Sequence, residues 1–298
     1  MIVIWEQVLI LFLFAFVGFC LGKKKLVGQE QARVLSTLSV YVFLPCRLFK
    51  SFSGNVTVSY MMAHGGDILL SAGIVLIMGT VAHFVAKVLT KAPYERSIYE
   101  YSMTSSNFAY MGYALAGSLY GETALINMMF FGLPVTVYNY TRGFCMLTKK
   151  KLTPKQLLQP SILAILLGSA VGLSGLPVPS LPGEVVTMAS SCMAPISMLL
   201  TGIVVSGYSL RALFGHKPLY FVTALRLVII PCLLGLATKR IYPPALPSVL
   251  LLYAMPTGLN TILFPRLVGE NCEIGAGLAC VSTALSCVTI PLILSIFL

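Results

Sequence analysis

Ten apolar segments follow one another along the chain with little sequence between them. The hydrocarbon layer of a bilayer, about 30 Å thick, needs roughly 20 apolar residues per helix. Only 10% of the 298 residues are charged, whereas an ordinary soluble domain has about 25%. The sequence therefore predicts an all-α membrane protein without a separate soluble domain. Its ten transmembrane helices are expected near 3–21, 32–51, 67–89, 97–119, 123–147, 156–175, 182–209, 217–237, 246–268 and 274–297.

The basic residues alternate between the two sides of this arrangement. If the N-terminus is outside, 15 of the 20 Lys and Arg fall in connections on the inner side, four fall on the outer side, and Arg226 lies within a span. Cytoplasmic connections carry such an excess. We therefore expect both termini to be extracytoplasmic in a plasma (inner) membrane. The net charge of +11 then reflects topology, and no nucleic-acid partner is expected.

Neither a catalytic nor a metal site is indicated. Seven of the eight cysteines fall within predicted spans and the eighth lies close to one, without metal-ligand spacing. The three histidines, His64, His83 and His216, are scattered, and no paired acids accompany them inside a span. The sequence predicts no enzyme, no metal site and no bound cofactor.

Three weak correspondences divide the chain into two halves. Leu119–Glu122, LYGE, closes the fourth span and Leu267–Glu270, LVGE, closes the ninth; Pro45 in the second span corresponds to Pro195 in the seventh. Polar interruptions also occur in both the fourth and the ninth span. Transporters are often built from inverted repeats. We therefore expect two inverted five-helix repeats, residues 1–148 and 149–298.

The interruptions, residues 105–112 and 254–260, suggest a binding site. A helix can be broken at membrane depth only where protein or a water-filled cavity meets the freed backbone groups. Two broken helices crossing near the midplane would aim their half-helix N-termini at a ligand, which favours an anion. Small polar residues also occur at ordinary helix contacts, and that interpretation stays open. The candidate substrate-binding residues are Ser105, Ser106, Asn107, Gly112, Pro256, Thr257, Gly258 and Asn260.

Ionisable groups within the spans bear on coupling. Arg226 could be the counter-charge for a carboxylate, it could extend to the inner membrane surface, or it could cap the carbonyls of a broken helix. None of the nine acids falls at the middle of a predicted span, so no strong proton-exchange group is evident; Glu100 and His83 come nearest. Sodium coupling, proton coupling and potential-driven uniport all remain open.

Several motifs resemble the auxin efflux carrier family, which includes the plant PIN-FORMED carriers and bacterial relatives. The stretch NFAYMGYALAGSLYG, residues 107–121, is similar to the N-x-x-x-M-G-x-P-L pattern ending in Y-G, and it adds Met111 to the candidate site. The family's second, eighth, ninth and tenth spans are similar to VYVFLPCRLF at 40–49, LRLVIIP at 225–231, AMPTG at 254–258 and residues 282–291. The resemblance extends over all ten spans.

The resemblance implies a crossover of broken helices 4 and 9. Spans 1, 2, 6 and 7 would form a scaffold that dimerises, and spans 3–5 and 8–10 a bundle that moves like an elevator. The substrate would be a small organic anion, an auxin-like carboxylate or a dicarboxylate. Ala114 stands where the family has its crossover proline, so we expect a less sharp break in span 4, carried by Asn107 and Gly112. The connection at 149–155 is short, as in bacterial-type members.

The function predicted from these features is secondary transport of a small organic anion by a homodimer in the lipid bilayer. A sodium-coupled carrier of the bile-acid symporter type is the alternative within transport; it would be expected to place acidic oxygens near the breaks. A transport-inactive receptor or scaffold is the alternative from another class.

Overall fold

The computed structural model describes residues 2–153, 158–208 and 216–298, which are helical almost throughout. Its only strand-like pairing in these ranges is an isolated bridge between Ser106 and Thr257. The all-helical class expected from the sequence is therefore confirmed. The predicted start of span 6, at residues 156–157, and the predicted end of span 7, at residue 209, lie outside the described residues.

Six helices in the described ranges are long and apolar enough to cross a bilayer: Ile2–Lys23, Glu30–Asn55, Val58–Leu89, Ser180–Ser206, Lys217–Ile241 and Glu273–Phe297. They correspond to predicted spans 1, 2, 3, 7, 8 and 10. Predicted span 6 is a shorter apolar helix, and spans 4, 5 and 9 consist of shorter helical pieces. The ten-span count itself remains a prediction.

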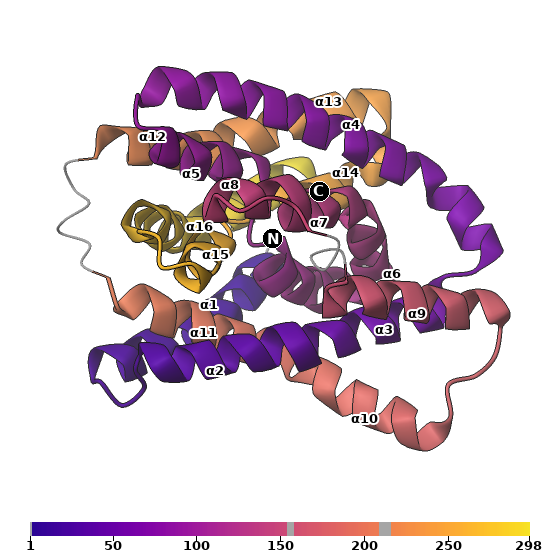
Figure 1. Cartoon of the computed structure of the whole chain (residues 1–298). Coiled ribbons are helices and arrows are strands. Elements are labelled where there is room, and N and C mark those ends of the chain that lie inside the picture. The colour runs from indigo at the N-terminus through magenta and orange to yellow at the C-terminus, as the bar shows by residue number, and fades with distance from the viewer. Residues whose placement is uncertain (1, 154–157, 209–215) are drawn as a thin grey trace.

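The helices of predicted spans 1, 2, 6 and 7 pack on one another, and we call them the first helix group. Helix α1 lies along α11, and α3 lies along α9 and α10. In Figure 1, α2, α3, α9 and α10 occupy the lower side of the view. The members are α1 (Ile2–Lys23), α2 (Gln29–Leu38), η1 (Ser39–Phe43), α3 (Leu44–Asn55), α9 (Pro160–Ser174), α10 (Ser180–Ser191) and α11 (Met193–Ser206).

The remaining helices form a second helix group, in which α4 packs against α5, α6 and α7, and α14 packs against α6 and α13. Figure 1 shows α4, α12 and α13 along the upper side, with α15 and α16 between them and the first group. The members are α4 (Val58–Leu89), α5 (Pro93–Thr104), η2 (Phe108–Gly112), α6 (Tyr113–Phe131), α7 (Leu133–Tyr138), η3 (Asn139–Gly143), α8 (Phe144–Thr148), α12 (Lys217–Ala224), η6 (Leu225–Ile229), α13 (Ile230–Ile241), η7 (Pro243–Ala245), α14 (Leu246–Tyr253), α15 (Asn260–Leu267) and α16 (Glu273–Phe297).

Small residues let α1 and α11 approach closely. A Cβ atom built on Gly202 would collide with the carbonyl oxygen of Ala15, and one on Gly18 with that of Leu199. Such contacts between backbones are typical of membrane helices, where packing takes over from the hydrophobic effect. The two glycines therefore fix the spacing of spans 1 and 7.

Wide π-helical turns accompany the prolines of two spans. The turn η1 ends just before Leu44 and Pro45, and η6 ends just before Ile230 and Pro231. Proline lacks an N–H and its ring clashes with the carbonyl one turn earlier, so the preceding turn must widen or kink. The proline positions thus set where these helices bend.

The two tetrapeptides that end in Gly-Glu also match in backbone conformation. Gly121 has φ 77° and Gly269 has φ 73°, a region that residues with a Cβ atom rarely adopt. The following glutamates are both paired, Glu122 with Arg47 at 3.0 Å and Glu270 with Lys149 at 2.8 Å. Equivalent turns therefore follow the fourth and the ninth predicted spans.

Candidate functional site

Predicted spans 4 and 9 are both interrupted, and the interruptions pair with each other. Helix α5 ends at Thr104; Ser105 is extended (φ −121°, ψ 149°), and η2 begins after Asn107 (φ −81°, ψ 42°). In the other span, α14 ends at Tyr253 and α15 begins at Asn260. We call the two breaks, residues 105–107 and 254–259, the crossover.

Backbone and side-chain hydrogen bonds join the two halves of the crossover. Ser106 and Thr257 form an antiparallel bridge, and the Asn107 N–H donates to the carbonyl of Pro256 over 2.8 Å. The Ser106 hydroxyl donates to the Leu252 carbonyl at 2.6 Å. Because buried backbone groups must find partners, each break satisfies part of the other's backbone.

Arg226 stabilises the crossover without lining the cavity. It is fully buried (0% exposed), and its guanidinium donates from Nε to the Met255 carbonyl at 3.1 Å and from Nη2 to the Leu252 carbonyl at 3.3 Å. A third, longer contact joins Nη1 to the Met103 carbonyl at 3.5 Å. Of the three roles considered from the sequence, this geometry matches the capping of broken-helix carbonyls, and the complete burial of Arg226 contradicts an extension to the membrane surface.

Two glycines permit the close approach of the broken helices. A Cβ atom on Gly258 would lie 3.0 Å from the Ser106 carbonyl oxygen. A Cβ atom on Gly112 would lie 3.1 Å from the Leu251 carbonyl oxygen and 2.6 Å from the terminal methyl of Met128. The glycines of both predicted interruptions therefore serve packing between the spans.

A cavity of 830 Å³ reaches from the surface to the crossover, between the two helix groups. Aromatic side chains form much of its wall, including Tyr41 from η1, Tyr113 from α6 and Tyr140 from η3. Its exposed end is formed by Glu30 and Arg33 of α2 and by Arg266 of α15. The cavity is large enough for a small organic molecule, since ligand pockets are typically about 300–1,000 Å³.

Buried amide groups line the deep part of the cavity. Asn107 is 2% exposed, and among the described residues neither of its amide atoms has a hydrogen-bond partner. The Oδ1 atom of Asn139, at the start of η3, likewise has no partner there. Asn260 also lines the cavity, and its Nδ2 donates to the Tyr101 hydroxyl at 3.0 Å. Because buried polar atoms are normally paired, these amides mark where a ligand would complete the hydrogen bonding.

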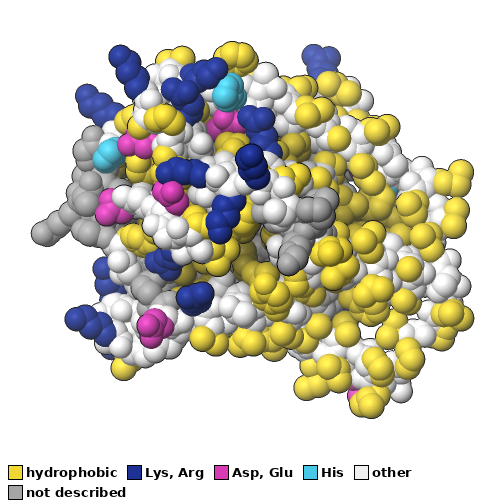
Figure 2. All heavy atoms as spheres, viewed as in Figure 1, with side chains coloured by type: hydrophobic (Ala, Val, Ile, Leu, Met, Phe, Trp, Pro, Cys, Tyr) yellow, Lys and Arg dark blue, Asp and Glu magenta, His cyan; other side chains and the backbone are white. Residues whose placement is uncertain are grey.

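The exposed end of the cavity lies on the basic side of the molecule. Figure 2 shows Lys and Arg side chains gathered over the side of the view at which α2 and α12 begin, while hydrophobic side chains cover the opposite side. Two arginines, Arg33 and Arg266, face one acid, Glu30, at the exposed end. Such a surplus of positive charge raises the local concentration of anions.

Four of the candidate residues expected from the sequence line the cavity: Ser106, Asn107, Gly258 and Asn260. The other six belong to the crossover or pack against it but do not line the cavity: Ser105, Met111, Gly112, Pro256, Thr257 and Arg226. Thr257, for example, donates its N–H to the Ser282 hydroxyl of α16 at 3.0 Å. The sequence interpretation located the crossover but did not separate these two roles.

Sequence reasoning missed the walls contributed by spans 2 and 5. Tyr41, Asn139 and Tyr140 were not among the candidates, although a polar asparagine within predicted span 5 was a usable signal. The expected break at Asn107 is present and is shorter, residues 105–107, than the break at 254–259 in span 9, but Gly112 is helical and takes no part in it. The chain there leaves the helix fully at Ser105, although Ala114 replaces the family's proline.

Comparisons with known proteins agree with this architecture. The family model described as membrane transport protein matches residues 3–153 and 141–294. A protein of Methanothermobacter thermautotrophicus (strain Delta H), described as an uncharacterized transporter, is 23% identical over 300 residues. The match covers 96% of this chain and 96% of that protein.

Proposed function

Since the chain belongs to the membrane transport protein family, the auxin efflux carrier family that its motifs resemble, we propose that it is a secondary transporter of a small organic anion. The substrate binds in the cavity at the crossover. The observation that carries this proposal is Asn107, a buried amide without a protein partner in the described ranges, located where two broken helices meet a cavity.

The polarity of the crossover favours an anion. The helical segments that begin at Phe108 and at Asn260 both start beside the cavity, so the partial positive charge of their N-termini lies close to a negative group bound there. The amides of Asn107 and Asn260 add N–H donors. A carboxylate bound there replaces the water that these donors would otherwise require.

The cavity walls suit the organic part of such a substrate. Tyr41, Tyr113, Tyr140 and Phe264 surround the amides with aromatic surface from four predicted spans. Small-molecule sites commonly combine apolar walls with a few polar groups that fix the orientation of the ligand. The substrate class is therefore a carboxylate with an apolar body, auxin-like, or a compact dicarboxylate.

The position of the cavity between the two helix groups supports an elevator mechanism. In this proposal the first helix group is a scaffold that dimerises in the bilayer. The second group moves with the crossover across it. If the basic side is cytoplasmic, as the charge distribution predicts, the cavity is open to the inside in this structure, and both termini are extracytoplasmic in the plasma (inner) membrane.

A thermal-shift screen of small carboxylates tests the binding site. Indole-3-acetate and malonate are added to purified protein with and without sodium, because a ligand that binds the folded state raises its Tm. Binding that requires sodium would favour the sodium-coupled alternative.

Counterflow of radiolabelled carboxylate in proteoliposomes then separates transport from binding alone. We expect exchange by the wild type and reduced exchange by Asn107→Ala, with Thr80→Val on α4 as a control outside the cavity. Binding without any exchange would indicate a receptor and overturn the transport proposal.

A further inference from the structure

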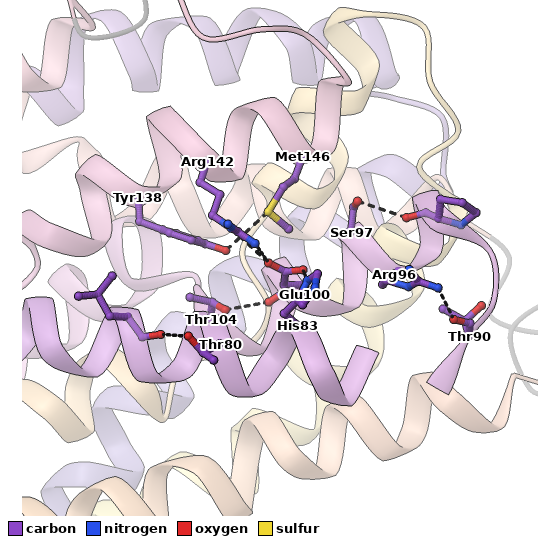
Figure 3. Close-up of polar contacts among 12 residues, drawn as sticks. Thr80, His83, Thr90, Arg96, Ser97, Glu100, Thr104, Tyr138, Arg142 and Met146 are labelled. Carbon is purple, nitrogen blue, oxygen red and sulfur yellow. Dashed lines mark hydrogen bonds and ion pairs between the residues drawn. The ribbon is translucent and has the colours of Figure 1, made fainter. Parts of the chain in front are cut away.

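A second polar cluster lies outside the cavity and joins three elements of the second helix group. Glu100 of α5 is 3% exposed, and its Oε1 accepts from Arg142 Nη2 at 2.6 Å and from Nε at 3.2 Å. Its Oε2 lies 2.8 Å from His83 Nδ1. Figure 3 shows these three side chains directed at one another from α5, η3 and α4. Although the sequence offered no acid at the middle of a span, Glu100 is therefore a buried carboxylate.

The charges of this cluster leave one proton-binding atom. The Glu100 carboxylate and the Arg142 guanidinium neutralise each other, and the ionised carboxylate can only accept hydrogen bonds. His83 must then donate through Nδ1, which leaves Nε2 to take up a proton. The His83 side chain is 35% exposed, so its ring is not sealed inside the helix bundle. Imidazole is the side chain whose charge changes between about pH 5 and 8.

The cluster is connected to the substrate site through two short paths. Glu100 precedes the crossover by only five residues, about 7.5 Å of helix α5. The backbone carbonyl of Glu100 also accepts a hydrogen bond from the hydroxyl of Thr104, the last residue of that helix. Arg142 belongs to η3, which begins with the cavity-lining Asn139. A change of charge at the cluster therefore acts on both walls of the site.

We propose that the Glu100–His83–Arg142 cluster is the proton-exchange site of the carrier, so that substrate and proton move in the same direction. This inference rests on the proposed transport function. Protonation of His83 at Nε2 gives the cluster a net positive charge, which is costly at membrane depth. An anion at the crossover offsets that charge, so each ligand favours the binding of the other.

Other titratable groups lie on the elements that form the cluster and on those packed against α5. On its own helices, Lys87 lies one turn beyond His83, and Arg96 lies one turn before Glu100 and donates to the Thr90 carbonyl. From α7, the Tyr138 phenol lies beside Arg142 (Figure 3). The remaining elements packed on α5 are α8, α12, η6, α15 and α16. Their titratable side chains are Cys145, Lys217, Tyr220, Arg226, Arg266, Glu273, Cys280 and Cys287.

The structure also provides a matched control on α4. His64 Nδ1 lies 2.7 Å from Asp67 Oδ2, and Asp67 is buried, but this pair lies within one helix and near its other end. It reproduces the chemistry of a histidine–carboxylate pair without the bonds to α5 and η3. The variant Asp67→Asn therefore tests whether the connection to the crossover matters.

Proteoliposomes loaded with radiolabelled malonate test the proposal, because the neutral form of a lipophilic monocarboxylic acid such as indole-3-acetate crosses the bilayer by itself and would follow a pH gradient without the carrier. The membrane potential is clamped with valinomycin and equal potassium. With the potential clamped, a carrier that moves one proton with each substrate should hold about a tenfold substrate gradient at a gradient of one pH unit, the equivalent of 1.36 kcal/mol. We expect this accumulation in the wild type and in Asp67→Asn. Glu100→Gln and His83→Gln should lose it while counterflow at equal pH continues.

The outcomes separate coupling from transport. Wild-type counterflow without pH-driven accumulation, or accumulation that survives in both cluster variants, would overturn the proton site and leave the transport function intact. If neither carboxylate exchanges, the transport proposal fails for these substrates, and ¹⁵N-histidine NMR of the purified protein still decides the proton site. The histidine signal that is absent from the spectrum of His83→Gln belongs to His83. In the wild type its chemical shift must change with pH between pH 5 and 9; a shift that does not change overturns the proposal.

Discussion

Removing the Arg226 guanidinium should destabilise the protein by about 3 kcal/mol. Two of its bonds, to Met255 at 3.1 Å and Leu252 at 3.3 Å, have ordinary lengths, and the contact of 3.5 Å to Met103 is weak. Bonds from a charged donor contribute about 1.5–3 kcal/mol each, so the pair contributes roughly 3–6 kcal/mol. The variant recovers part of the cost of burying a charge, and Leu252 keeps its bond from Ser106.

The assay is thermal unfolding of Arg226→Ala in detergent, followed by size-exclusion chromatography of the heated protein. At about 2 °C per kcal/mol for a large domain, Tm should fall by about 6 °C. The Tm of Arg226→Lys should lie between the Tm of Arg226→Ala and that of the wild type. The lysine ammonium keeps the charge, but it lacks the planar fork with which a guanidinium reaches two carbonyls.

Arg47→Ala is the matched control for this prediction. Arg47 pairs with Glu122 at 3.0 Å, but the Glu122 side chain is 55% exposed. Exposed ion pairs contribute about 0–1 kcal/mol, so Tm should change by no more than about 2 °C. If Arg226→Ala and Arg47→Ala have the same Tm, Arg226 does not stabilise the crossover, and the reasoning is refuted.

Three further predictions concern the site and its turns. Asn107→Ala and Asn260→Ala should each weaken carboxylate binding about tenfold, since one lost hydrogen bond of about 1.4 kcal/mol corresponds to that factor; calorimetric Kd values equal to the wild type in both would count against the site. Gly121→Ala should lower stability by roughly 1–3 kcal/mol, because φ 77° and ψ −172° suit only glycine. Gly73→Ala in α4, where a Cβ meets no atom within 4 Å, is the control and should not lower stability. A lower Tm for Gly73→Ala than for Gly121→Ala would contradict this prediction. Ala114→Pro should change Tm by less than about 2 °C, because the wide turn η2 ends just before Tyr113 and Ala114, in the way that η1 and η6 end just before Leu44–Pro45 and Ile230–Pro231; loss of folded protein on gel filtration would refute it.

The sequence alone predicted those features that depend on residues close together in the chain. The apolar segments, the glycines of the turns at 121 and 269, and the proline at 256 act through nearby backbone, so their consequences follow from residue type. The positions of the two breaks were predicted for the same reason, and the structure has both. The ligand that occupies them is a proposal, since hydrogen-bond capacity does not identify a substrate.

Features that depend on contacts between distant residues could not be predicted in this way. The sequence named Glu100 and His83 only as separate, weak candidates for proton exchange, yet His83 and Arg142 both contact Glu100 from 17 and 42 positions away. The wall formed by Tyr41 and Asn139 depends on how spans 2 and 5 pack, which no single motif encodes. Burial and pairing of a polar residue are properties of the assembled bundle.

The break in span 4 shows how one proline can interrupt two helices. Ala114 leaves that span without the family's proline, yet its helix ends fully at Thr104. The partner is in span 9: Pro256 ends one helix, and its carbonyl then accepts the N–H of Asn107. The Ser106 hydroxyl meets the Leu252 carbonyl in the same way. The polar groups exposed by the first break therefore stabilise the second, so the break in span 4 should form only when span 9 is packed against it.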